Sequence, residues 1–567
     1  MNASLRLSLA ALLFVLAARA AGPDLGPNVL IFDPSMTNIQ ARVDEIFARQ
    51  ERAQFGSNRF ALLFQPGSYH LDVQVGFYTE VAGLGRSPDD VAITGAVRSK
   101  ARWLGNANAT CNFWRSLANL SVTPTVESNV NVWAVSQATA VRRLHVKGDL
   151  YLWDGGWSSG GFLADSVVDG VVNSGSQQQW LSRNTAWGRW KGSNWNMVFL
   201  GVTHPPEGRW PTPPYTVIDR TPVVREKPYL AVDEAGRWSV MVPGLVRDAV
   251  GPSWGAAAAP ATSATALPLE AFHIARPGLD SAATLNAALG RGRHLLFTPG
   301  TYLLEAPVHV ARAGTVVLGL GYATLQPTNG TAALLVDDVA GVKIGGLICE
   351  AGPLKSASLV QVGEPGARAP HAEDPVCLWD ICCRVGGANA GGADAMMTIY
   401  SRDTLAENLW LWRADHGRGV SWTANPCRNG LVVNGDDVTI YGLFVEHTQD
   451  YQTLWNGNGG RVYFYQSELP YDPPSAAAWS HDGVTGYASY KVADAVKTHE
   501  AWGLGVYCVF YAAPVISENA FETPEALATH LHHLVTIRLS GKPNSGMNHV
   551  INGRGPAVVT TRKAVVD

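Results

Sequence analysis

Charged residues are scarce in this sequence, and neither sign is in marked excess. Lys, Arg, Asp and Glu together make up 16% of the 567 residues, and the formal net charge is −4. A protein that binds a phosphate backbone concentrates Lys and Arg on one face, and this composition offers no such basic field. Nucleic acid is therefore not an expected partner.

Long apolar runs are also lacking beyond the start of the chain. One run, from Leu7 to Ala18, follows a basic residue and precedes small residues suited to cleavage. A membrane-spanning helix needs roughly 20 apolar residues, so this shorter run favours a signal peptide over residues 1–20 rather than a membrane anchor. We expect a secreted, extracellular protein with no membrane contact after signal cleavage. Acceptor triplets that suit a secreted glycoprotein begin at Asn108, Asn119 and Asn329.

Cysteine is rare, and its count is odd. The seven cysteines leave at least one without an intrachain partner, and their spacing matches no zinc-ligand set. Two interpretations stay open for Cys377, Cys382, Cys383 and Cys427: one or two disulfides in an oxidising compartment, or buried free thiols. The sequence shows no motif for a metal ion or a cofactor, and we expect neither.

Glycine and aromatic residues are abundant instead, and the chain carries an internal duplication. Its 58 Gly, 19 Trp and 17 Tyr suit sheet-rich scaffolds and sugar-facing surfaces. The segment Leu-Leu-Phe-Gln-Pro-Gly-Ser-Tyr at 62–69 is echoed by Leu-Leu-Phe-Thr-Pro-Gly-Thr-Tyr at 295–302, and Gly-Leu-Gly at 83–85 by the same triplet at 319–321. Such self-similarity predicts two copies of one structural unit.

An amphipathic helix is predicted before each copy, and short strands after it. Apolar residues recur at helical spacing, at Ile39, Val43, Ile46 and Phe47 and again at Leu285, Ala288 and Leu289. The strands that follow are β-branched and broken by Gly, Asn and Asp, without further helices. A hairpin meander would give the same local pattern, but a helix that caps the first coil favours a β-solenoid.

The predicted fold is all-β: two tandem right-handed parallel β-helices, each with an N-terminal capping helix. A low-complexity, alanine-rich stretch lies between the copies. The predicted organisation is a signal peptide (1–20), a first β-helix domain (21–250), a linker (251–270) and a second β-helix domain (271–567). Large ligands commonly bind at the junction of two such units. We expect a monomer.

Two acidic residues of the second copy are spaced by about one solenoid coil. Glu446 and Glu468 are 22 residues apart, and repeats of this kind start near 20 residues. Equivalent positions on adjacent coils lie roughly 4.8 Å apart, so the carboxyl groups should be neighbours. Two such groups raise at least one pKa, and glycoside cleavage needs a protonated acid beside a second carboxylate. The alternative is that both are solvated turn residues and that nearby aromatics pack between coils.

The same region resembles glycoside hydrolase family 55, the exo-β-1,3-glucanases that act on laminarin. The resemblance is carried by Glu-Asn-Leu-Trp-Leu-Trp-Arg-Ala-Asp-His at 407–416, Tyr-Gly-Leu-Phe-Val-Glu-His at 441–447 and Tyr-Gln-Ser-Glu-Leu-Pro-Tyr at 465–471. It implies the twin β-helix architecture, exo action on β-glucan and an inverting mechanism.

The resemblance also implies roles for individual residues. Glu468 would be the general acid, and Glu446 the second essential carboxylate, acting on the water side or through its charge. The subsite for the terminal glucose would be lined by Trp412, Asp415 and Tyr471. In the first solenoid, Gln178 is the residue that we expect to help hold the water.

Two other functions remain open on the sequence alone. A polysaccharide lyase on a β-helix would need a calcium-binding Asp cluster and a basic residue facing a uronate, and no such cluster lies near Glu468 in the sequence. A non-catalytic glycan-binding or cell-wall protein would keep the cleft without the reaction. The presence of both carboxylates favours a hydrolase.

Overall fold

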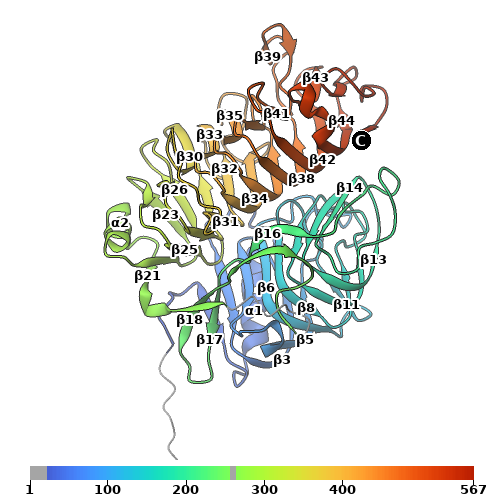
Figure 1. Cartoon of the computed structure of the whole chain (residues 1–567). Coiled ribbons are helices and arrows are strands. Elements are labelled where there is room, and N and C mark those ends of the chain that lie inside the picture. Colours follow the sequence, from blue (N-terminus) through green and yellow to red (C-terminus); the bar gives the residue numbers. More distant parts are fainter. Residues whose placement is uncertain (1–21, 256–263) are drawn as a thin grey trace, which may run out of the picture.

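The computed structural model describes residues 22–255 and 264–567, and nearly all of its regular structure is β-strand. The strands form two parallel β-helices that lie side by side, one blue to teal and the other yellow to red (Figure 1). The predicted all-β class with two tandem parallel β-helices is confirmed. The expected signal peptide (1–20) and residues 256–263 of the expected linker lie outside the described residues.

The first β-helix contains a central row of strands, each paired in parallel with the next. The row runs through β1 (Val29–Phe32), β2 (Phe60–Phe64), β4 (Thr79–Gly83), β6 (Arg115–Pro124), β8 (Ala140–Val146), β10 (Phe162–Ala164), β12 (Gln179–Arg183), β14 (Asn196–Leu200) and β15 (Tyr215–Ile218). The coils are completed by β3 (Gly67–Gln74), β5 (Val91–Arg98), β7 (Val130–Val132), β9 (Asp149–Tyr151), β11 (Val167–Asn173) and β13 (Ala186–Lys191). Strand β2 is buried at every position, as expected for parallel strands covered on both faces.

Antiparallel strands follow the first β-helix and connect it to the second. They are β16 (Thr221–Arg225), β17 (Tyr229–Val232), β18 (Trp238–Val242), β19 (Leu245–Ala249) and β20 (Thr265–Pro268). Strand β18 pairs with both β17 and β20. Strand β20 lies within the expected linker (251–270), where its backbone finds hydrogen-bond partners on β18.

The second β-helix has two long rows of strands. One row runs through β21 (Phe272–Ala275), β22 (His294–Phe297), β25 (Val316–Gly319), β28 (Lys343–Gly345), β31 (Cys377–Trp379), β34 (Leu405–Arg413), β36 (Thr439–Glu446), β38 (Gly460–Glu468), β42 (His499–Phe510), β44 (Leu531–Gly541) and β46 (Lys563–Val566). The other runs through β24 (Val308–Val310), β27 (Leu334–Val336), β30 (Ser356–Val362), β33 (Ala393–Ile399), β35 (Cys427–Val433), β37 (Thr453–Trp455), β41 (Tyr490–Val492), β43 (Ile516–Glu522) and β45 (Gly546–Ile551). Shorter strands are β23 (Thr301–Leu304), β26 (Thr324–Pro327), β29 (Ile348–Glu350), β32 (Cys382–Val385), β39 (Ser480–His481) and β40 (Val484–Thr485).

Two α-helices cap the solenoids, as the sequence predicted. Helix α1 (Ile39–Gln50) packs on the first core and α2 (Ala282–Gly290) on the second. Ser281 begins α2 by accepting a hydrogen bond from the backbone N–H of Thr284. Short 3₁₀ turns are η1 (Pro88–Asp90), η2 (Leu269–Ala271) and η3 (Glu525–His530). In the described part of the chain, neither α-helix nor any other helix has the length and apolarity to cross a membrane.

A third apolar core lies between the two β-helices, in addition to the core inside each. It combines Phe113 and Trp114 of the first helix with Trp410, Trp412 and Phe444 of the second. The rings of Phe113 and Trp410 are 4.9 Å apart, and those of Trp410 and Trp412 are 5.3 Å apart. Aromatic contacts of this kind fix two elements in one geometry, so the two solenoids form a single packed body.

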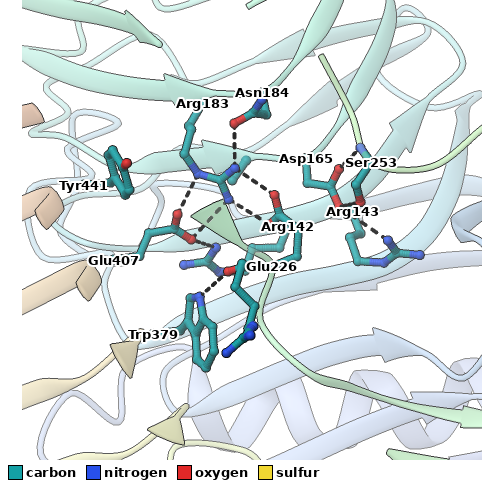
Figure 2. Close-up of polar contacts among 12 residues, drawn as sticks. Arg142, Arg143, Asp165, Arg183, Asn184, Glu226, Ser253, Trp379, Glu407 and Tyr441 are labelled. Atoms are coloured by element: carbon teal, nitrogen blue, oxygen red, sulfur yellow. Dashed lines mark hydrogen bonds and ion pairs between the residues drawn. The ribbon is translucent and has the colours of Figure 1, made fainter. Parts of the chain in front are cut away.

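Buried ion pairs hold the same junction (Figure 2). Arg183 forms paired hydrogen bonds of 2.7 Å with Glu226, and its Nε lies 2.6 Å from a carboxylate oxygen of Glu407 on β34. Arg142 reaches Glu407 as well and makes contacts of 2.8 to 3.2 Å with Asp380. Each charge in this cluster therefore meets an opposite charge from another segment.

All seven cysteines lie in the described residues as free thiols, and six of them are buried. The open alternative is thus settled in favour of buried thiols for Cys377, Cys382, Cys383 and Cys427. Asn119 is buried too, and its side-chain amide donates to the carbonyl oxygens of Gly83 and Gly85. The triplet at Asn119 cannot carry a glycan in this fold, because its amide nitrogen is enclosed.

Candidate active site

Three adjacent strands of the second β-helix bring the predicted residues into one row. Trp412 on β34 is the register partner of Glu446 on β36, and Glu446 is the register partner of Glu468 on β38. Residues in register point to the same face of a sheet, with backbones about 4.8 Å apart. The spacing of 22 residues therefore equals one coil, and the two glutamates are neighbours as the sequence predicted.

A bend divides each of these strands into two arms. Asn408 on β34, Gly442 on β36 and Phe464 on β38 share the left-handed conformation, with φ of 56°, 78° and 73°. They interrupt the register at the same level of the stack. One arm carries Glu407 into the ion-pair cluster between the helices, and the other arm ends at the candidate site.

The glutamates face a cavity of about 270 Å³ with walls from both β-helices. All six residues that the sequence analysis selected line it: Gln178, Trp412, Asp415, Glu446, Glu468 and Tyr471. The first helix also contributes Thr110, Cys111, Phe113, Gln137 and Ser159. The predicted cleft at the junction of the two solenoids is thus present.

Glu446 is held by nitrogen donors at both carboxylate oxygens. Trp410 donates its indole N–H to Oε2, and Gln466 donates its side-chain amide to Oε1, each at 2.9 Å. Only 1% of the residue is exposed. Burial raises the pKa of Glu446 to about 7, although both hydrogen bonds favour the anion and oppose that rise. Both donors are N–H groups, and a carboxyl oxygen that carries a proton would accept from them only weakly. The two contacts therefore favour the carboxylate form of Glu446.

Glu468 has a different environment on the next strand. Burial raises its pKa well above the usual value, and the nearby charges of Glu446 and Asp415 raise it further. Tyr471 donates its phenolic hydroxyl to Oε2. A carboxyl group in these surroundings keeps its proton at neutral pH, which is the state that a general acid requires.

Asp415 stays ionised beside two histidines. It contacts Nδ1 of His416 at 2.9 Å, and Nε2 of His447 lies 3.9 Å away. Burial opposes ionisation, but the hydrogen bond with His416 and the charges of both imidazoles outweigh it and hold the pKa of Asp415 at about 2. The site therefore contains a permanent anion close to the protonated Glu468.

A buried arginine fixes the segment that carries Tyr471. Arg413, the last residue of β34, binds both carboxylate oxygens of Asp472 at 2.8 and 2.9 Å. It also donates to the carbonyl oxygen of His447 at 3.1 Å. Paired contacts of this kind set orientation as well as distance, so Tyr471 is held against Glu468.

Sequence reasoning missed Gln137 and Ser159 of the first solenoid, and several nearby aromatic residues lie away from the cavity. Gln137 and Ser159 line the cavity, and Ser159 donates to the side-chain oxygen of Gln178 at 3.0 Å. Trp455 and Tyr465, two aromatic residues close to Glu446 and Glu468 in the sequence, lie inside the second solenoid core. Tyr451 packs on Tyr487, with ring centroids 5.2 Å apart. Inward and outward residues alternate along a strand, and counting from Glu468 would have placed Tyr465 on the inner face.

The acidic and histidine side chains of the cavity belong to the types that hold metal ions in proteins. Over residues 22–255 and 264–567, no group of three or more His, Cys, Asp or Glu side chains is arranged to hold a metal ion.

Residues 272–468 match a protein family described as the LAM55 pectate lyase-like domain. A curated exo-beta-1,3-glucanase from Streptomyces sp. (strain SirexAA-E / ActE) is 48% identical over 538 residues, which cover 94% of this chain and 87% of that protein.

Solved structures of sacteLam55A from Streptomyces sp. SirexAA-E are similar along almost the whole chain. One is 46% identical, with a TM-score of 0.92, and the match covers 96% of this chain and 98% of the other. A second, a glutamate-to-alanine variant in complex with glucose, is 45% identical with the same TM-score of 0.92 and the same coverage of 96% and 98%.

Proposed function

The chain belongs to glycoside hydrolase family 55, the LAM55 glucanases, and we propose that it is a secreted, exo-acting enzyme that releases glucose from laminarin-like β-1,3-glucan with inversion. Family membership supports hydrolysis of β-1,3-glucan over the lyase and the non-catalytic binding protein. Exo action is supported by the name of the curated relative, and secretion by the apolar run that begins at Leu7.

Terminal glucose fits the cavity between the two helices. Trp412 contributes to one wall of the cavity, and the ionised Asp415 offers acceptors for sugar hydroxyls. A relative of this chain has been solved in complex with glucose. We assign Trp412, Asp415 and Tyr471 to binding of the terminal residue.

Glu468 acts as the general acid in this proposal. Its retained proton passes to the glycosidic oxygen as the bond to the anomeric carbon breaks, and Glu468 is left as the carboxylate. Tyr471 donates to that carboxylate and stabilises the charge. Tyr471 thus has a role on both sides of the proton transfer.

Water attack is assigned to the opposite side of the sugar. Glu446, whose anionic form accepts hydrogen bonds from Trp410 and Gln466, stabilises the positive charge that develops at the anomeric carbon. Gln137, Ser159 and Gln178 reach the cavity from the first helix and offer hydrogen-bond groups that can orient the water. Inversion follows if this water attacks the anomeric carbon directly and its proton passes to the Glu446 carboxylate.

One observation carries the proposal: Glu446 and Glu468 are register partners on adjacent strands in a shared cavity. The test is the Glu468→Gln variant assayed for glucose release from laminarin. The amide keeps the shape of the carboxyl group but carries no transferable acid proton, so we expect a loss of about 10²–10⁴-fold in kcat. An unchanged melting temperature controls for folding, and undiminished turnover would refute the assignment.

Product analysis tests the remaining features. Glucose as the sole early product indicates exo action, and α-glucose detected by NMR in the first minutes indicates inversion. Larger oligosaccharides or early β-glucose would contradict the respective parts of the proposal. Growth of a producing strain followed by assay of the medium tests secretion.

A further inference from the structure

Four polar side chains lie behind the glutamate pair, at the contact between the two β-helices. Gln179 on β12, Asn196 on β14 and Gln466 on β38 are 0% exposed, and Tyr507 on β42 is 1% exposed. The side-chain oxygen of each has no hydrogen-bond partner within residues 22–255 and 264–567. An unpaired buried polar oxygen costs folding free energy, so four in one region require an explanation.

The four side chains come from neighbouring strands of the two β-helices. Gln179 and Asn196 are register partners on adjacent strands of the first helix. Asn196 donates its side-chain amide to the carbonyl oxygen of Gly503 on β42, 2.8 Å away. In Figure 1, β14 lies directly beside β38 and β42. The first β-helix therefore presents the side-chain amides of Gln179 and Asn196 to the strands that carry Gln466 and Tyr507.

Gly505 makes room for the hydroxyl of Tyr507 in this region. Gly505 is the register partner of Gln466, and a Cβ atom at position 505 would lie only 2.5 Å from the phenolic oxygen of Tyr507. The hydroxyl thus occupies the side-chain position of residue 505, one strand away from Gln466. Phe444, the register partner of Gln466 on its other side, lies with Gln179 against Gly160.

The orientation of each amide is set by what its nitrogen donates to. Gln466 donates to Glu446 at 2.9 Å, Asn196 to the carbonyl oxygen of Gly503, and Gln179 to the hydroxyl of Ser159 at 3.3 Å. Three amide oxygens therefore remain as acceptors, and the phenol of Tyr507 supplies one O–H donor. Water supplies two further donors and can accept from the phenol, which matches the chemistry of a small polar site closed to solvent.

We propose that Gln466, Tyr507, Gln179 and Asn196 form a buried water site that locks the amide of Gln466 onto Glu446. Gln466 is then a positioning residue: it acts on the reaction only through Glu446. A water that donates to Oε1 of Gln466 prevents the amide from rotating and polarises its N–H groups toward the carboxylate. This inference rests on the proposed function, because it concerns the ionisation of the residue assigned to the water side.

The crystal structure of the wild-type enzyme is the first test, and it does not depend on activity. Density for one or more waters should lie within about 2.7–3.2 Å of the side-chain oxygens of Gln466 and Tyr507. Contacts near 2.4 Å would identify a hard cation instead, and a direct bond between Tyr507 and Gln466 would leave no place for a water. Either result would overturn the proposal, even for a protein without glucanase activity.

The second test is the pH dependence of kcat/KM for Gln466→Met and Tyr507→Phe. Methionine keeps the length of Gln466 but cannot donate to Glu446, so the pKa of Glu446 rises and the acidic limb should move up by about one pH unit. Tyr507→Phe removes only the hydroxyl and should move the limb in the same direction by a few tenths of a unit. KM should change little in both variants.

Tyr441→Phe is the matched control. The hydroxyl of Tyr441 donates to the carbonyl oxygen of Val223, on the arm of β36 away from the site. Its loss should leave the pH profile unmoved, whatever it does to stability. A Tyr507→Phe profile that coincides with that of the Tyr441→Phe control would reject the water lock, whereas absence of glucan hydrolysis in the wild type would reject the proposed function and leave the crystallographic test standing.

Discussion

At the scale of single residues, the two carboxyl groups differ in what surrounds them rather than in their distance from solvent. Glu446 accepts nitrogen donors at both oxygens, whereas Glu468 sits beside two other acids and accepts from the phenol of Tyr471. Unequal surroundings push the pKa values of paired acids apart. The assignment of Glu468 as acid and Glu446 as anion follows from this difference.

A buried Glu446 should make the enzyme less stable as the pH rises. Its pKa is about 7 in the folded protein against a usual 4.5, so the folded state binds more protons than the unfolded state between these values. The contribution of Glu446 to the free energy of unfolding is fully present below pH 4.5 and falls as the pH rises to 7. The total decrease is up to about 3 kcal/mol. We expect Glu446→Gln to melt higher than the wild type at pH 8.

The pH trend, and not the value at one pH, is the decisive measurement for this variant. Replacement of Glu446 also alters its hydrogen bonds with Trp410 and Gln466, whose preference for the anion is already contained in the net rise of its pKa. Calorimetry of both proteins from pH 4 to pH 8 should show the difference shifting in favour of Glu446→Gln. A constant difference would mean that burial of this carboxyl group has no free-energy cost.

Strand periodicity made most of the site residues predictable. Glu446 and Glu468 are one coil apart, and Trp412, Asp415 and Tyr471 follow from the family motifs around them. Gln137 and Ser159 were not predicted. They belong to the first solenoid, and the coil repeat of the second solenoid does not relate their positions to that of Glu468. Only the packing of one helix on the other brings them to the cavity.

At the scale of elements, the capping helices and parallel strands were predictable because each has a local signal. Helical spacing marked α1 and α2, and apolar segments bounded by Gly and Asn marked the strands. The antiparallel strands β16 to β20 were not predicted. Their pairing joins segments as far apart as β18 and β20, and local sequence does not encode such long-range pairing.

The element that joins the two solenoids most directly is strand β34. Its residue Glu407 lies between Arg142 and Arg183 (Figure 2). The cluster as a whole balances the cations of Arg142, Arg183 and Lys227 with the anions of Glu226, Glu407 and Asp380. Glu407→Gln would leave one uncompensated positive charge in the buried junction. We expect a loss of about 3–5 kcal/mol, seen as a lower melting temperature by calorimetry.

An exposed ion pair of the same solenoid provides the control for Glu407. Arg428 and Asp450 are 2.8 Å apart, but the arginine side chain is 66% exposed. Asp450→Asn should cost less than about 1 kcal/mol, because water solvates the separated charges. Equal effects of the two substitutions would show that burial at the junction adds nothing to the ion pairs there.

At the scale of the whole molecule, duplication produced the site by placing two similar solenoids against each other. The second solenoid supplies both glutamates, and the first supplies the opposite wall with Gln137, Ser159 and Gln178. Neither copy alone encloses the cavity. The internal repeat in the sequence predicted the two bodies and a cleft between them, but it contained no information on which faces meet.

Contacts between the solenoids, rather than the continuity of the chain, should hold the cavity together. The junction contains the aromatic core around Trp410 and the ion pairs of Glu407, and strand β20 crosses back to pair with β18. We therefore expect an enzyme with a protease site in place of residues 256–263 to stay intact after cleavage. Its two fragments should co-elute in size-exclusion chromatography and retain glucan hydrolysis within about twofold, because buried contacts of this extent do not need a covalent link.

Introducing Glu407→Gln into the cleaved enzyme should lower the urea concentration at which the fragments separate and activity disappears, whereas Asp450→Asn should not. Fragments that part without denaturant would show that the chain connection, and not the junction, maintains the active site.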